Sequence, residues 1–132
     1  MIKEIKYKNK IIATIYKKTE KERGINFLTN QKDNLQVGIL NHPKNHIIQS
    51  HIHNPIKRII TGTNEILYVE KGRMKVILYN KIKEKIATVI LQKGDLINLV
   101  SAGHGFKFLK DSRIIYLKQG PYVNKEIDKK IL

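Results

Sequence analysis

Two histidines separated by one residue, His51 and His53, are the strongest chemical signal in the sequence. On a β-strand their side chains would point to the same side, with Cα atoms about 6–7 Å apart. Two imidazoles so placed can chelate one ion, and because imidazole titrates close to neutral pH, either can act as a general base. An exposed polar strand face would permit the same pattern.

A carboxylate and a third imidazole follow on separate predicted strands. Glu65 opens an apolar segment that ends near Gly72, and His104 lies between two glycines. A closed β-barrel could bring these side chains to the same internal point as the histidine pair. We therefore expect His51, His53, Glu65 and His104 to point into one cavity.

Short apolar segments separated by turn residues recur along the chain, as is typical of antiparallel β-structure. Gly72 and the pair Asp111–Ser112 are expected to form tight hairpins, and residues 124–132 a short helix. The predicted fold class is therefore all-β, a sandwich or barrel. The predicted strands are residues 11–16, 26–28, 35–40, 47–53, 65–69, 74–79, 86–91, 96–100, 106–109 and 114–117.

The length of 132 residues corresponds to one domain, residues 1–132, with a core over about residues 11–122. No apolar segment approaches the roughly 18 residues of a membrane span, and the N-terminal residues do not resemble a signal peptide. We therefore expect a cytoplasmic protein without a membrane partner. Because the chain has no cysteine, any metal would have to be held by His, Asp or Glu.

The net charge of +15 raises the question of nucleic acid. However, 22 of the 26 basic residues are Lys and only 4 are Arg, the residue favoured for bidentate recognition of phosphates and bases. The lysines are also scattered along the chain. We expect no specific nucleic-acid binding, whereas attraction of an anionic small molecule remains open.

The motifs resemble those of the cupin family of small jelly-roll barrels. The first cupin motif, G-x5-H-x-H-x3/4-E-x6-G, is matched by His51, His53, Glu65 and Gly72, although eleven residues separate His53 from Glu65. The second motif is met in part by Gly94 and His104. Residues 53–72, 93–106 and 117–122 are similar to short bacterial cupins encoded beside surface-polysaccharide and sugar-nucleotide genes.

This resemblance implies an all-β, double-stranded β-helix, and cupins are commonly dimers. It also implies that His51, His53, Glu65 and His104 hold a divalent transition metal such as Fe, Mn, Ni or Zn. The sequence does not choose among these ions.

Three further residues are candidates for binding a small anionic or sugar-like ligand. Arg58 could hold a phosphate or carboxylate, or it could cap a loop carbonyl or lie in solvent. Lys118 could face an anion while Tyr122 covers a sugar ring, or the segment could be a C-terminal turn that closes one end of the barrel.

The sequence is compatible with three functions. The first is an isomerase or epimerase of a nucleotide-linked or phosphorylated sugar, with His51 or His53 as the general base. The second is a metal-dependent cupin with Lewis-acid or oxygenase chemistry. The third is a non-catalytic module that binds a small molecule.

Overall fold

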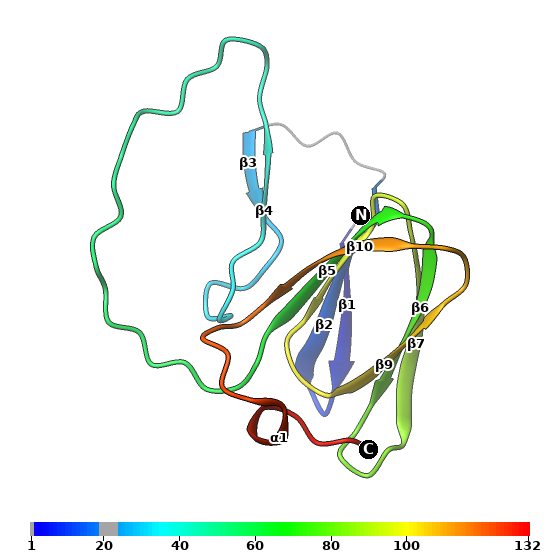
Figure 1. Cartoon of the computed structure of the whole chain (residues 1–132). Coiled ribbons are helices and arrows are strands. Elements are labelled where there is room, and N and C mark those ends of the chain that lie inside the picture. The colour runs from blue at the N-terminus through cyan, green and yellow to red at the C-terminus, as the bar shows by residue number, and fades with distance from the viewer. Residues whose placement is uncertain (1, 19–23) are drawn as a thin grey trace.

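The computed structural model describes residues 2–18 and 24–132, and in these ranges the chain is all-β, as the sequence predicts (Figure 1). Ten antiparallel strands are followed by one short helix. They are β1 (Ile2–Tyr7), β2 (Lys10–Tyr16), β3 (Gly24–Phe27), β4 (Gly38–Asn41), β5 (Glu65–Lys71), β6 (Arg73–Tyr79), β7 (Lys85–Gln92), β8 (Leu96–Leu99), β9 (Gly103–Phe108), β10 (Arg113–Lys118) and α1 (Lys125–Asp128).

The strands form three sheets. A five-stranded sheet has the order β1-β2-β8-β5-β10 and a three-stranded sheet the order β7-β6-β9, while β3 and β4 pair with each other as a separate two-stranded sheet. Among the described residues, β9 and β10 are therefore edge strands, each with one side of its backbone unpaired.

The core lies between the five-stranded and the three-stranded sheet. Alternate residues of β6, Met74, Val76 and Leu78, are completely buried, because side chains two positions apart point to the same face of a strand. Ile15 on β2 and Ile97 on β8 meet them from the opposite sheet. The two sheets thus form one sandwich with a continuous apolar interior.

The turn residues behave differently from the sequence-based expectation. Gly72 has a φ of +94°, but it links two sheets, since β5 and β6 do not pair with each other. Asp111 and Ser112 likewise connect β9 to β10 across the sandwich. The hairpin prediction was therefore wrong at both sites. A side chain at position 72 would collide with Ser112 and Asp111, so the β5–β6 connection and the β9–β10 connection lie in direct contact.

Two strand predictions also need correction. β1 was missed, and the predicted strand at residues 47–53 does not form. Instead, residues 43–62 are twenty consecutive exposed residues without a strand or helix, which we call the arm. Figure 1 shows the arm as a wide excursion away from the sandwich.

The arm is too apolar for an ordinary solvated loop. It carries six exposed isoleucines, and full burial of one such side chain contributes about 1.5–3 kcal/mol. Its C-terminal end is fixed by Asn64, whose buried side-chain amide donates hydrogen bonds to Asn98 Oδ1 and, at 2.8 Å, to the Leu99 carbonyl. The isoleucines are Ile47, Ile48, Ile52, Ile56, Ile59 and Ile60.

Candidate functional site

The candidate site lies at the open side of the sandwich, between the edge strands β9 and β10. Opposite residues of an antiparallel pair share a face, so His104 and Phe106, which pair with buried Leu78 and Val76, point into the sandwich. Both side chains nevertheless remain partly exposed, since no further strand of the described chain covers β9. The two sheets therefore leave inward-facing side chains accessible to a small molecule.

Glu65 is the centre of this site. It is the first residue of β5 and is buried, with only 7% of its surface exposed. Its Oε2 lies 2.8 Å from His104 Nε2, and its Oε1 accepts a 2.7 Å hydrogen bond from the Tyr116 hydroxyl. One carboxylate thus joins an imidazole from the three-stranded sheet to a phenol from the five-stranded sheet.

Strand register explains why Tyr116 reaches this carboxylate. Lys118 of β10 stands opposite Glu65, and Tyr116, two residues earlier, points to the same face. The position of Tyr116 in an apolar strand by itself indicates a core or rim residue. The sequence does show that Tyr116 and Lys118 are two residues apart and therefore share a strand face. It does not show that this strand pairs with β5, which lies about fifty residues earlier.

The electrostatics favour an ionised Glu65. Burial raises the pKa of this carboxyl, but hydrogen bonds from His104 and Tyr116 and the nearby charges of His104 and Lys118 outweigh burial, so that its pKa is lowered. For Tyr116, burial and the hydrogen bond to Glu65 raise the pKa well above the ordinary value. A carboxylate that accepts from a neutral phenol is therefore the stable arrangement at neutral pH.

Lys118 and Tyr122, the two predicted ligand-binding residues near the C-terminus, lie together. The Lys118 ammonium is 5.7 Å from the centre of the Tyr122 ring and forms an ion pair with Asp128 of α1. The hydrogen bond to Asp128 raises the pKa of Lys118. No motif in the sequence points to Asp128, which joins α1 to β10.

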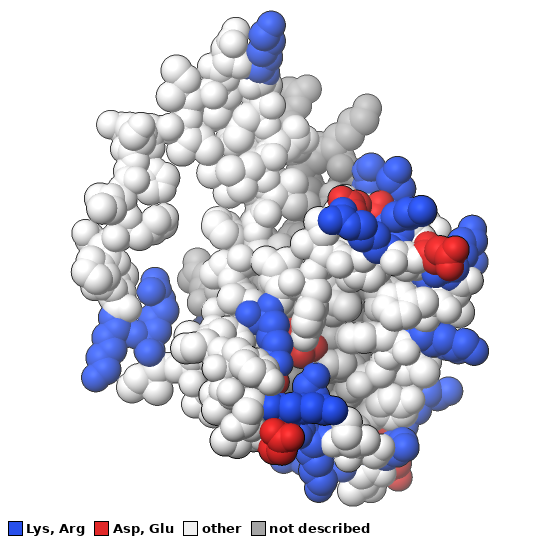
Figure 2. Space-filling model, viewed as in Figure 1, with Lys and Arg blue, Asp and Glu red and all other residues white. Residues whose placement is uncertain are grey.

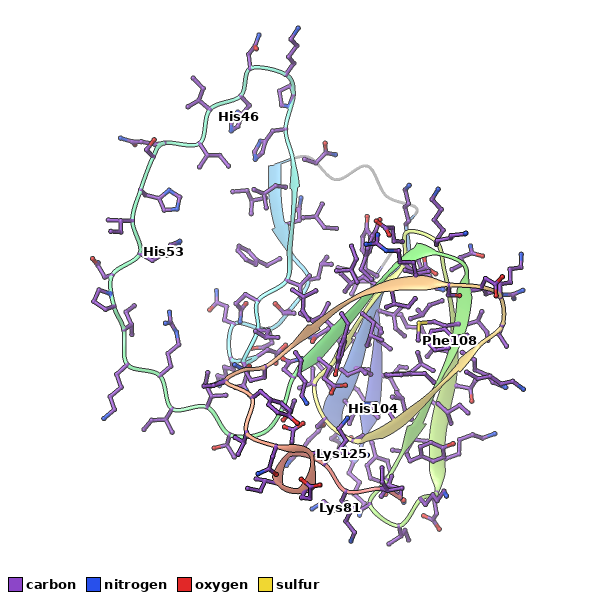
Figure 3. All side chains as sticks on the ribbon, viewed as in Figure 1. His46, His53, Lys81, His104, Phe108 and Lys125 are labelled. Carbon is purple, nitrogen blue, oxygen red and sulfur yellow. The ribbon has the colours of Figure 1, made fainter. Side chains whose placement is uncertain are left out.

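The structure does not bring His51, His53 and Arg58 to this site. All three are exposed on the arm, and Figure 3 shows His53 far from His104. The rings of His51 and His53 meet edge to face with centroids 5.2 Å apart. The expected convergence of four side chains in one cavity is therefore not present in a single chain, because residues 47–53 have no strand to pair with.

A metal site is not assembled in this arrangement. Within residues 2–18 and 24–132, no three His, Asp or Glu side chains lie close enough together to hold an ion. Glu65 and His104 supply two ligands, fewer than the three or four protein ligands of typical transition-metal sites. The metal hypothesis stays a prediction.

A further cavity of the described chain lies elsewhere. It has a volume of about 690 Å³ and opens between the β1–β2 and β6–β7 connections, where Lys8, Lys10 and Lys81 line it. None of the candidate residues lines this cavity. It offers three ammonium groups and the carboxylate of Glu84, but no histidine lines it.

On the face that Figure 2 shows, the described basic residues do not gather in one stripe. Figure 2 shows Lys and Arg scattered over the visible face of the sandwich, with a few acidic residues among them. No helix in the described ranges is long and apolar enough to cross a membrane.

Comparisons with protein families, with curated proteins and with solved structures found no significant match. The likeness to cupins therefore rests on the motifs of the sequence, and functional assignment rests on the geometry of the site.

Proposed function

We propose that this protein is a jelly-roll protein that binds a carbohydrate or sugar nucleotide and transfers a proton next to a carbonyl, as isomerases and epimerases do. The observation that carries the proposal is the 2.8 Å contact between Glu65 and His104. Between β5 and β10 the chain passes from one sheet to the other after β5, β7, β8 and β9, which supports the jelly-roll topology.

In this proposal, His104 is the group that exchanges the proton. Oε2 of the ionised Glu65 carboxylate lies 2.8 Å from Nε2, and its negative charge favours the tautomer with the proton on Nε2. Nδ1 is then the nitrogen that accepts a proton from the substrate and returns it. Glu65 also stabilises the imidazolium that forms when His104 takes the proton.

The neighbouring side chains supply binding and orientation. The Phe106 ring stacks on His104 with centroids 5.2 Å apart and offers a flat apolar surface beside the reacting position. Lys118 and Tyr122 supply a positive charge and an aromatic ring at the edge of the same site. The net charge of +15 favours anionic ligands such as phosphorylated sugars.

The assignment of the base to His51 or His53 stays a prediction, since these residues lie on the arm. Within one chain, His104 is the histidine that touches a buried carboxylate. A binding module that performs no reaction would use the same Phe106, Lys118 and Tyr122 surface, but it would not need the imidazole–carboxylate pair.

The test is deuterium exchange in D₂O, followed by proton NMR, with nucleoside-diphosphate-linked keto sugars and with keto and aldo sugar phosphates as probes. We expect the proton next to the carbonyl to exchange, and His104→Ala to slow the exchange by about 100-fold or more. His46→Gln, an exposed histidine outside the site, is the control. Binding of a probe without deuterium exchange would contradict an enzymatic function and favour a non-catalytic binding module. Equal exchange rates in wild type and His104→Ala would exclude His104 as the base.

A further inference from the structure

The arm has the sequence of a strand but no partner strand. Residues 47–53 were predicted as a strand from their β-pattern, yet they extend into solvent with Ile47 at 83% and Ile52 at 89% exposure. A peptide segment of this kind is stabilised when it adds to the open edge of a sheet, through backbone hydrogen bonds and burial of alternate side chains.

β9 offers such an edge. It pairs with β6 on one side only, and its inward-facing Phe106 and Phe108 remain 38% and 56% exposed. The edge strand β1 differs, because it carries the charged residues Lys3, Glu4 and Lys6, which discourage pairing with another chain. Of these two edges, β9 is therefore the one whose exposed side chains an added strand would cover.

We infer that residues 47–53 of one copy of this chain add as a strand to β9 of a second copy, and that the exchange is reciprocal. The occupant is a second copy because the arm extends away from its own β9, as Figures 1 and 3 show, while its C-terminal end is held in the sandwich by Asn64. Exchange of an identical element between two copies closes a two-fold dimer and covers both open edges at once.

The size of the surface agrees with a stable dimer. Each copy would contribute the seven residues of the added strand and the six of its own β9, and the other exposed residues of the arm extend this surface towards the roughly 20–30 residues that each partner contributes to a standard interface. The added strand is seven residues long against the six of β9, so it can cover that edge over its whole length.

The exchange would also change the candidate site. On the added strand His51 and His53 share one face, and with this face turned into the sandwich the pair stands beside His104 of the other copy. Ser50 and Ile52 then face outward, on the same side as Lys107 of β9, which pairs with Lys75. Each site of the dimer would thus combine imidazoles from both copies.

The first test is the mass in solution by light scattering at about 100 µM protein. We expect twice 15.4 kDa for the wild type and 15.4 kDa for the double variant Ile47→Lys, Gln49→Lys, whose side chains are exposed in a single chain and would share the inward face with His51 and His53 on the added strand. Ile82→Lys, at an exposed isoleucine of the β6–β7 connection, should remain a dimer. A monomeric wild type, or a dimer that survives the arm substitutions, would overturn the exchange.

The second test distinguishes strand exchange between two copies from pairing of residues 47–53 with β9 of the same chain. Because the chain has no cysteine, two variants, Ser50→Cys with Lys107→Cys and Ile52→Cys with Lys107→Cys, can form only designed disulfides. Exchange predicts a covalent dimer on a non-reducing gel for at least one variant. A cross-linked monomer, or no cross-link in either variant, contradicts it. Neither test measures catalysis, so the result stands apart from the proposed function.

Discussion

Tyr116 and Glu65 are joined across two neighbouring strands by a hydrogen bond of 2.7 Å from the phenol to the carboxylate. The same carboxylate contacts His104 through its other oxygen, so the phenol and the imidazole hold it from two sides. This relationship makes Tyr116 a positioning residue for Glu65 and leads to the first prediction.

Replacement of Tyr116 by Phe should lower the free energy of unfolding by about 1–2 kcal/mol, because hydrogen bonds to charged groups contribute more than neutral ones. Denaturation with urea at pH 7 measures the change. Tyr122→Phe, at a ring that is 71% exposed, should change stability by less than about 0.5 kcal/mol. Equal effects of the two substitutions would show that the Tyr116 hydrogen bond contributes nothing.

The lowered pKa of Glu65 predicts how stability depends on pH. The folded protein binds its proton less tightly than the unfolded chain does, so ionised Glu65 stabilises the fold above the ordinary glutamate pKa. This stabilisation is lost as the pH falls through the lowered pKa of the folded state. Melting temperatures of wild type and Glu65→Gln should therefore differ at pH 7 and converge towards pH 3. A constant difference over this range would contradict the ionised state.

Asp95 is expected to stabilise the fold and not to take part in catalysis. It is 2% exposed, and its Oδ2 accepts hydrogen bonds from the Lys17 ammonium at 2.7 Å and from the Gln92 backbone at 2.9 Å. Asp95→Asn should cost about 2–3 kcal/mol of unfolding free energy, somewhat less than for a fully buried pair because Lys17 is partly exposed. The urea midpoint should fall accordingly, while exposed Asp111→Asn leaves it nearly unchanged.

The scattered charge predicts opposite effects of salt on two kinds of association. Binding to DNA or RNA should be weak and should disappear between 50 and 200 mM salt, as expected for diffuse phosphate contacts. Self-association of a chain with a charge of +15 should instead strengthen over this range, because salt screens the repulsion between copies. Fluorescence titrations and sedimentation measure the two trends. Salt-resistant, sequence-selective binding to nucleic acid would show that the lysines form a specific surface.

The sequence predicted most strands because their side chains alternate between core and surface, as in β6. It did not predict β1, because the charged side chains of β1 obscure the alternation of apolar and polar residues. It predicted a strand at residues 47–53 because a local pattern reveals strand propensity but not whether another strand is available for pairing. For the site, composition and spacing identified Glu65 and His104. The contact of Tyr116 with Glu65 depends on the register of two distant strands, which a local pattern does not contain.

The pairing of β2 with β8 has a consequence for biosynthesis. Ala13 stands opposite Leu99, so the two strands cannot pair completely until Leu99 has left the ribosome. Contacts between residues so distant in sequence slow folding, because a long loop must close before they form. During translation β2 can therefore pair only with its neighbour β1, and the five-stranded sheet is expected to complete its folding after β5 and β8 have been synthesised.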